Sequence, residues 1–267
     1  KNEYIDYSVL VSQASTIWAE AREKDDFALY LPTLEKIISY QRKIAKYLQT
    51  PTLKGYDVLL DLYEEGMTTV EYDAFFAKLR EELVPFVLSA TSNKKPHPKK
   101  LTKGFFPKEK QKEFSEYLTG VFAYDMKHAV LKESAHPFTS NNNTYDVRIT
   151  TRYIENILES SIFSTIHEMG HAIYEQQVDA SLNVTRLGGG ASMGIHESQS
   201  RMYENMIGRS YAFWEVHFDK LKEIFAKELK GVTLLDFYKY INRAERSLIR
   251  TEADELTYSL HIMVSYE

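Results

Sequence analysis

The sequence of 267 residues contains no cysteine. This absence excludes disulfide frameworks, thiol nucleophiles and cysteine-ligated zinc sites together. Imidazole and carboxylate groups are then the side chains left to hold a transition metal. The lack of cysteine also suits a reducing compartment, and we expect a cytoplasmic protein.

Long apolar runs and an excess of basic charge are missing as well. No run approaches the roughly 20 apolar residues that span a bilayer, and the first residues lack the apolar stretch of a signal peptide. The formal net charge is -5, and the acidic excess is spread along the chain. We therefore expect neither a membrane nor a nucleic acid as a partner. A composition of 43% hydrophobic and 27% charged residues is typical of a soluble globular protein.

The two ends lack the usual signals of a complete chain. The sequence does not begin with methionine, and residues 258–267 have the pattern of the middle of an amphipathic helix without a stop signal. We therefore expect the chain to be a fragment of a longer protein.

Apolar residues at helical spacing run through most of the sequence and predict a mainly α fold. Prolines, glycines and capping residues divide this pattern into segments. The predicted helices cover residues 4–48 (two helices), 57–65, 69–89, 108–122, 155–177 and most of 195–267.

Two segments break the helical pattern. Residues 141–143 supply turn chemistry, and residues 147–153 alternate between apolar and polar, which predicts a strand or hairpin in a helical protein. Residues 93–107 contain prolines, a glycine and a lysine cluster, and we interpret them as an exposed connection rather than a nucleic-acid site. The predicted organisation is an N-terminal helical scaffold (1–92), this connection, and a catalytic region (108–267).

The segment His167-Glu168-Met169-Gly170-His171 has the His-Glu-x-x-His pattern. One helical turn brings both imidazoles onto one face, where they can bind a single zinc ion. The apolar stripe of the same helix lies on the other side, and Phe163 and Tyr174 flank the histidines, so we expect both faces to be covered. A pair of solvent-facing histidines is the alternative, but a buried imidazole pair without a partner would be costly, and a metal removes that cost.

A catalytic zinc ion needs a third protein ligand and an open position for water. Glu197 follows His171 across a glycine-rich break, in a segment that could form a second helix against the first. His196 is the competing candidate. An ordinary ion pair of Glu197 with Arg201 is the alternative explanation of the carboxylate, and the residues alone leave these choices open.

At this point the sequence resembles the carboxypeptidase Taq (thermostable carboxypeptidase 1) family of zinc metallocarboxypeptidases. The resemblance covers about residues 136–254. Its five blocks occur in the family's order: His136-Pro137-Phe138, Asp146-Val147-Arg148-Ile149-Thr150, His167-Glu168-Met169-Gly170-His171, His196-Glu197-Ser198-Gln199, and Ile249-Arg250-Thr251-Glu252-Ala253-Asp254.

The resemblance implies a long helical bundle around a deep active-site groove, of the gluzincin type, with a small β-hairpin or sheet near the site. It implies a homodimer, and it makes Glu197 the third metal ligand beside His167 and His171. The family's last block, Gly-x-x-Gln-Asp-x-His-Trp, is absent here, and we expect it beyond Glu267. The implied cofactor is Zn²⁺, although the same ligands also bind Co²⁺.

The implied reaction is release of single amino acids from the C-termini of peptides. Glu168 is the expected general base, which takes a proton from water and passes it to the departing amine. The substrate carboxylate needs a planar cationic partner, and Arg148 and Arg250 are the candidates. Their alternatives are an exposed strand position for Arg148 and a helical ion pair with Asp254 for Arg250.

His136 is a further substrate-binding candidate, and a structural turn before Pro137 is its alternative. The donor to the oxyanion is not assigned: His261 is a candidate, helix packing is its alternative, and the donor can also lie beyond residue 267. Two other functions stay open. One is a zinc oligopeptidase that cuts internal bonds, and the other is a helical binding module with a structural metal.

Overall fold

The computed structural model describes residues 2–92, 96–246 and 253–267. Their contacts divide the chain into two compact units, residues 1–75 and 76–267. Residues 76–92, which the sequence pattern groups with the N-terminal helices, belong by their contacts to the second unit. The assignment of a scaffold role to 1–92 and of catalysis to 108–267 stays a prediction. Within the described ranges, no helix has the length and apolarity to cross a membrane.

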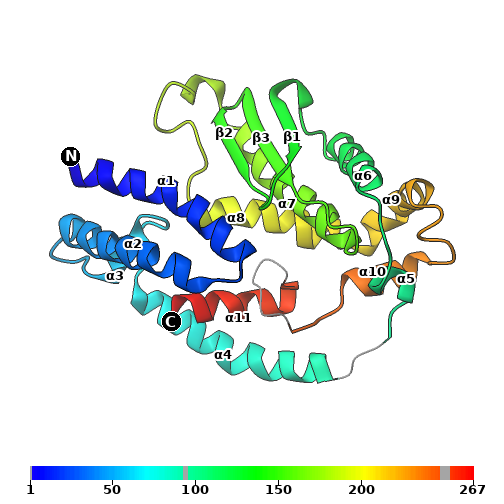
Figure 1. Ribbon diagram of the computed structural model, residues 1–267, viewed down its shortest axis with the longest axis horizontal. Helices are drawn as coiled ribbons and strands as arrows, with labels where there is room; N and C mark the ends of the chain where they lie inside the picture. The colour runs from blue at the N-terminus through cyan, green and yellow to red at the C-terminus, as the bar shows by residue number, and fades with distance from the viewer. Residues whose placement is uncertain (1, 93–95, 247–252) are drawn as a thin grey trace. The chain divides into compact units, whose positions relative to one another are not determined.

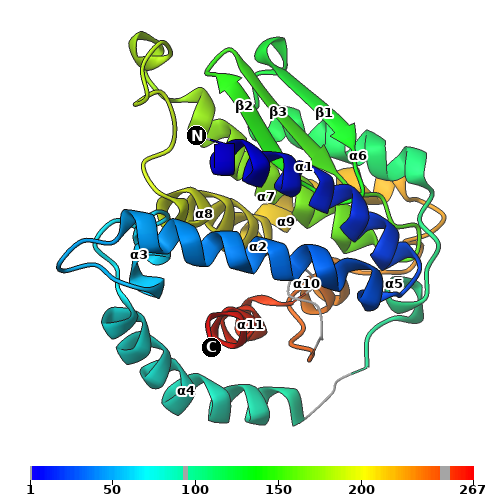
Figure 2. The same cartoon turned by 60° about the vertical axis from the view of Figure 1, so that its left-hand side comes forward.

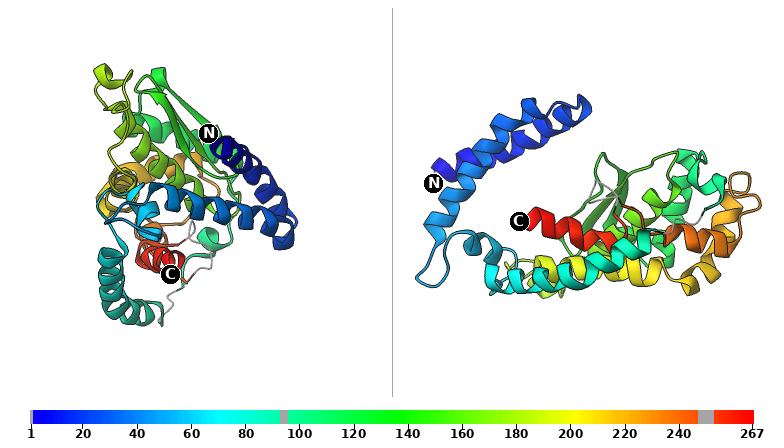
Figure 3. Two further views of the ribbon diagram at one scale, coloured as in Figure 1. Left: turned by 90° about the vertical axis from the view of Figure 1, so that its left-hand side faces the viewer. Right: turned by 90° about the horizontal axis from the view of Figure 1, so that it is seen from below.

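The first unit is helical, as predicted. Asp26 caps the second helix by accepting a hydrogen bond from the Leu29 backbone N–H. The first two helices run side by side (Figure 3, right), with the Tyr7 ring against Tyr40 and the Tyr7 hydroxyl 2.6 Å from the Gln41 amide nitrogen. The elements of this unit are α1 (Asn2–Glu23), α2 (Phe27–Leu48), α3 (Tyr56–Asp61) and the start of α4 (Thr69–Ser92).

The second unit combines helices with one small sheet (Figure 1). The mainly helical class with a small sheet is thereby confirmed. After α4 its helices are α5 (Lys99–Thr102), α6 (Lys108–Val121), α7 (Leu158–Gln176), α8 (Met193–Arg201), α9 (Tyr211–Ile224), α10 (Leu234–Ile241) and α11 (Glu255–Tyr266). Shorter helical turns are η1 (Met126–His128) and η2 (Ala180–Leu182), and η3 (Met202–Gly208) is a π-helix.

The sheet contains β1 (Ala129–Glu133), β2 (Thr139–Asn143) and β3 (Asp146–Thr151) in the order β1-β3-β2 (Figure 2). The predicted hairpin corresponds to β2 and β3, which are antiparallel, and β1 adds a parallel strand on the other side of β3. Residues 141–143, predicted as the turn, instead lie in β2, and the turn is at residues 144–145. The strand predicted to reach residue 153 ends at Thr151.

One face of β3 packs on α7. Val147, Ile149 and Thr151 are fully buried, and the Thr165 hydroxyl of α7 lies 3.1 Å from that of Thr151. Adjacent strand residues point to opposite faces, so Arg148 lies on the face away from α7. The sheet and α7 therefore form two layers with a common core.

The predicted apolar stripe is buried along α7, where Leu158, Ile162, Ile166, Met169 and Ile173 are each at most 9% exposed. Its first predicted member, Ile154, lies before the helix and is only partly buried. They join a core that includes the aromatic side chains of α6, α9 and α10. The stripe therefore fixes which face of α7 turns to the core and which face carries the histidines.

The sequence predicted an exposed connection at residues 93–107, but its described part, residues 96–107, is partly buried. Leu101 and Phe106 are fully buried, and α5 occupies part of the segment. The Phe106 backbone N–H donates to the Glu155 carbonyl, and its ring packs edge-on against Phe225. These two buried side chains are enough to pack the segment against the core despite its many lysines, because burial of each large apolar side chain contributes about 1.5–3 kcal/mol to the stability of the fold.

Candidate metal centre

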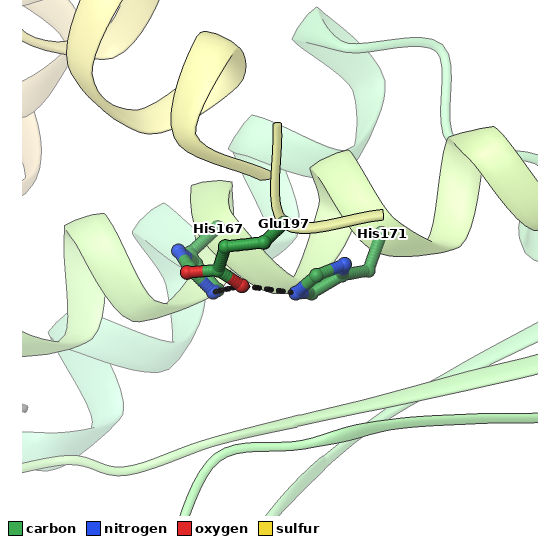
Figure 4. Close-up of side chains that lie close together, drawn as sticks. All are labelled: His167, His171 and Glu197. Atoms are coloured by element: carbon green, nitrogen blue, oxygen red, sulfur yellow. Dashed lines mark ion pairs between the residues drawn. The ribbon is translucent and has the colours of Figure 1, made fainter. Parts of the chain in front are cut away.

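The three residues predicted as metal ligands come together in space. His167 and His171 lie one turn apart on α7, and Glu197 reaches them from α8 (Figure 4). Each offers a ligand atom, and these atoms all lie within 4.8 Å of one another. Oε2 of Glu197 is 3.4 Å from Nε2 of His171 and 3.8 Å from Nε2 of His167.

A close approach of two helices makes this geometry. A Cβ atom added to Gly170, between the two histidines, would lie 2.7 Å from the Cα of Ser200, so a glycine is needed where α8 crosses α7. Ser192 caps α8 by accepting from the Ile195 N–H, which fixes where that helix begins. Glu197 is thereby carried to the histidine face of α7 by backbone packing rather than by a long flexible arm.

The outer nitrogen of His167 is held by a second carboxylate. Nδ1 of His167 is 2.9 Å from Oε2 of Glu204, which lies in the π-helix η3. Arg209 donates to the other oxygen of Glu204 at 3.0 Å, and Arg201 approaches at 3.4 Å. The Arg209 guanidinium also stacks 3.8 Å from the centre of the Phe163 ring. His167 thus has one nitrogen directed to Glu197 and the other fixed from outside.

The outer nitrogen of His171 meets a third imidazole. Nδ1 of His171 is 2.6 Å from Nδ1 of His196, and Nε2 of His196 is 2.6 Å from Oε1 of Glu175. Both ring nitrogens of His196, the competing candidate for third ligand, are therefore occupied, one by the outer nitrogen of His171 and the other by Glu175.

Glu168 lies beside this group and is only 7% exposed. Its Oε2 accepts a hydrogen bond from the Thr139 hydroxyl of β2 at 2.6 Å. On the opposite side, the Tyr258 hydroxyl of α11 lies 3.4 Å from Oε1 of Glu197, and the Arg201 guanidinium stacks 3.9 Å from the Tyr258 ring centre. Strand β2 and helix α11 therefore each contribute a hydroxyl to the two glutamates.

The charges of the cluster are strongly coupled. Burial alone would raise the pKa of Glu197, but the hydrogen bond with His171 and the charge of His167 lower it to about 2. Burial likewise opposes ionisation of Glu204, and its bond to His167 and the charge of Arg209 bring its pKa to about 2. Burial lowers the pKa of His167, but Glu204 and Glu197 outweigh burial and raise it. The site is therefore built to hold positive charge between two carboxylates.

This donor set suits a divalent transition metal. Two imidazole nitrogens and one carboxylate oxygen are the ligands of many catalytic zinc sites. The outer nitrogens of both histidines are held by hydrogen bonds, as is usual for metal-binding histidines. The residues therefore fit a metal ion such as Zn²⁺ or Co²⁺.

Of the residues predicted to bind substrate, Arg148 and His136 lie in the described part of the chain. Arg148 forms two hydrogen bonds with the Asp146 carboxylate, at 2.6 and 2.7 Å, on the sheet face away from α7. His136 is exposed in the connection before β2, and His261 is partly buried in α11. Arg250 lies outside the described residues. The substrate roles of these residues stay predictions.

Four residues of the centre escaped the sequence reasoning: Thr139, Glu175, Glu204 and Tyr258. Glu175 follows His171 by four residues, so the helical period alone puts it on the same face, and that signal was available. Glu204 depends on the π-helix, and Thr139 and Tyr258 depend on tertiary packing. No local pattern marks these three.

The family of the chain follows from comparison with known proteins. The sequence model described as carboxypeptidase Taq (M32) metallopeptidase matches residues 1–267. The chain belongs to this family. Its resemblance to the family, first seen in five blocks of the second half, therefore extends over the whole chain.

Curated members of the M32 family are similar to the chain over nearly all its length. Carboxypeptidase 1 of Bacillus subtilis is 47% identical over 266 residues, which are 99% of this chain and 53% of the relative. Thermostable carboxypeptidase 1 of Thermus thermophilus is 41% identical and is matched over 96% of this chain and 52% of the relative. The chain thus spans about half the length of these curated relatives.

Solved structures give the same result for the fold. The crystal structure of the M32 carboxypeptidase from Deinococcus radiodurans R1 superposes with a TM-score of 0.86 at 40% identity, over 98% of this chain and 52% of that one. The fold described above is therefore that of the M32 family.

Proposed function

We propose that the protein is a zinc-dependent metallocarboxypeptidase that releases single amino acids from the C-termini of peptides. The observation that carries the proposal is the convergence of His167, His171 and Glu197, with Glu168 buried beside them. Membership of the M32 family and the names of its curated relatives support the same activity.

In the proposed mechanism, His167, His171 and Glu197 hold the metal. The bound ion supplies positive charge that acidifies water and polarises the scissile carbonyl. Glu168 accepts the proton of the attacking water and passes it to the departing amine. The Thr139 hydroxyl donates to Oε2 of Glu168, which orients the carboxylate and leaves its other oxygen for the proton.

The edge of the sheet offers a place for the peptide. Strand β2 is an outer strand of the sheet, and Thr139 on this strand contacts Glu168. An extended peptide can pair with the free edge of such a strand through backbone hydrogen bonds. We therefore propose that the scissile bond lies alongside β2, in the deep groove that the family resemblance implies.

Replacement of Glu168 tests the catalytic assignment. The Glu168→Gln variant should keep its bound metal and lose about 10²–10⁴-fold in kcat, since the general base is removed and the ligands remain. Metal content by elemental analysis and kcat on an N-blocked dipeptide give the two readings. Normal turnover by the variant would refute the role, and inactivity of the metal-loaded unmutated protein would favour a binding module with a structural metal.

The competing activity is that of a zinc oligopeptidase. A matched pair of substrates, an N-blocked peptide and the same peptide with a C-terminal amide, distinguishes this activity from that of a carboxypeptidase. A carboxypeptidase cleaves the free acid and not the amide, because its binding energy includes the substrate carboxylate. Equal cleavage of the two substrates would favour the oligopeptidase.

The same substrate pair tests the predicted arginines. Arg148→Gln or Arg250→Gln should raise KM for the free acid with little change in kcat, if the arginine binds the C-terminal carboxylate equally in the ground and transition states. His136→Ala serves as a third variant in the series. An unchanged KM in a variant would remove that residue from the binding site.

The proposal includes Zn²⁺ as the resident ion, with Co²⁺ as an active substitute, and a cytoplasmic homodimer. Elemental analysis of protein purified without added metal tests the ion. Light scattering on the same sample tests the dimer.

A further inference from the structure

The two candidate ligand histidines are supported in different ways. His167 reaches a carboxylate directly, through Nδ1 and Glu204 at 2.9 Å. His171 instead contacts Nδ1 of His196 at 2.6 Å, and the Nε2 of that second ring contacts Oε1 of Glu175 at 2.6 Å. His171 is therefore linked to a carboxylate through a second imidazole, in the series His171, His196, Glu175.

The chemistry of imidazole fixes the direction of every hydrogen bond in this series. A neutral imidazole has one N–H and one lone pair. If Nε2 of His171 gives its lone pair to a metal, its Nδ1 carries the hydrogen and must donate to His196. Nδ1 of His196 then accepts, so its Nε2 carries the hydrogen and donates to Glu175. One arrangement of protons satisfies all three groups.

The far end of the series is held rigidly. The side chain of Glu175 is 7% exposed. Its Oε1 also accepts from the Gly190 N–H at 3.2 Å, and its Oε2 accepts from the Asn141 amide of β2 at 2.8 Å. The His196 ring packs edge-on against Tyr174. A carboxylate fixed by backbone and strand therefore sets the orientation of His196.

We propose that Glu175 and His196 are positioning residues that act in series to hold His171 in the tautomer and orientation that bind the metal. This inference rests on the proposed metal site. It assigns His196 a supporting role in place of that of a ligand, and it makes Glu175 part of the site through its hydrogen bond to His196.

Metal affinity is the reading that tests the series. The experiment uses the full-length protein after removal of its metal. Zn²⁺ is then added in competition with a chromophoric chelator. Glu175→Gln should weaken Zn²⁺ binding about 10–100-fold, the usual effect of losing an outer partner of a metal ligand. His196→Phe, which removes both ring nitrogens, should weaken it at least as much. The absorption spectrum with Co²⁺ reports altered ligand geometry in both variants.

A double-mutant cycle separates action in series from independent effects. His196→Asn keeps an acceptor near the position of Nδ1 and cuts the link to Glu175. In this background, Glu175→Gln should cause no further loss of affinity. Additive losses would show that Glu175 acts by another route and would overturn the proposal.

Glu159→Gln is the matched control. Glu159 lies on the same helix, has a 12% exposed side chain and is bonded to Tyr240 and Arg243 rather than to the histidines. The Glu159→Gln substitution should lower thermal stability and leave the Zn²⁺ dissociation constant within about twofold of that of the unmutated protein. His171→Ala identifies a failure of the metal site itself: unchanged Zn²⁺ affinity there overturns the proposed function. Lost affinity in His171→Ala with unchanged affinity in Glu175→Gln overturns the series alone.

Discussion

Protons and a metal ion compete for the space between His167 and Glu197. In the metal-free protein, Glu204 and Glu197 raise the pKa of His167 above its ordinary value of 6.5, although burial opposes this. A raised pKa means that the protonated imidazole stabilises the folded metal-free protein. This contribution is complete below the ordinary pKa and is lost as the pH rises through the raised value. Metal binding has the opposite pH dependence and is favoured at higher pH, because the metal binds only the neutral imidazole ring.

We therefore expect Zn²⁺ affinity to fall as the pH drops through the raised pKa of His167. Below that pKa, the affinity should fall about tenfold per pH unit for each proton that the metal displaces. Chelator competition between about pH 5.5 and pH 8 measures the slope. Glu204→Gln should move the onset to lower pH, because it removes a charge that raises the pKa of His167. A dissociation constant that stays flat across this range would contradict the prediction.

At the same scale, the sequence predicted which residues would meet but left the third ligand open. His196 and Glu197 are neighbours in the chain, and both side chains belong to ligand types that zinc accepts. The packing of α8 on α7 decides which of the two lies beside Nε2 of His171. No residue pattern contains that information. Family resemblance supplied the preference for Glu197, and the 3.4 Å distance agrees with it.

At the scale of elements, the contact between α7 and α8 leaves no room for a side chain at Gly170. Alanine is the better helix former, by about 0.8–1.0 kcal/mol over glycine, yet α7 has glycine at position 170. A Cβ there would lie 2.7 Å from the Ser200 Cα and 3.0 Å from the Gln199 carbonyl oxygen. Both are backbone atoms of α8, so the helix itself would have to move.

Gly170→Ala should therefore displace α8 and with it Glu197. We expect Zn²⁺ affinity to fall by more than about tenfold, a loss typical of disturbed metal sites, with little change in helix content by circular dichroism. Gly120→Ala is the control, since a Cβ at Gly120 in α6 meets no atom within 4 Å. That variant should keep its affinity and gain up to about 1 kcal/mol of stability. Equal affinities in the two variants would refute the close-packing explanation.

The elements differ in how well the sequence predicted them. The period of apolar residues located α7 and its buried face, because that helix packs on one side along its length. Strand β1 lies in the stretch where the helical pattern breaks, but the sequence did not mark it as a third strand, because its pairing with β3 is parallel and is not made by a hairpin turn. The π-helix η3 has no apolar period of its own that would mark it. It nevertheless carries Glu204 to His167, and π-helices often occur at functional sites.

At the scale of the whole molecule, the four residues assigned to metal binding and general-base catalysis lie in the unit of residues 76–267. Three segments distant in sequence meet there: β2, α7 and the continuous run of α8 and η3. A metal held by α7 and α8 adds a link between two helices that are otherwise joined by packing and by the hydrogen bonds of His196 to His171 and Glu175. Binding free energy should therefore appear as added stability of these segments.

The last prediction concerns where that stability appears. At 100 times its dissociation constant, a metal adds about 2.7 kcal/mol to the folded state. Hydrogen exchange measured by mass spectrometry, with and without Zn²⁺, should then show slower exchange in α7, α8 and η3, where the ligands and Glu204 lie. Helices α1 and α2 contain none of the proposed ligands, so their exchange should change little.

His171→Ala supplies the control for this experiment, since it removes one of the proposed ligands. Addition of Zn²⁺ to that variant should leave exchange in all segments unchanged. Protection that spreads evenly over both units in the unmutated protein would mean that the metal stabilises the chain without a link between α7 and α8. Because that result would detach the ion from Glu197, it would also remove the geometric basis of the proposed three-ligand site.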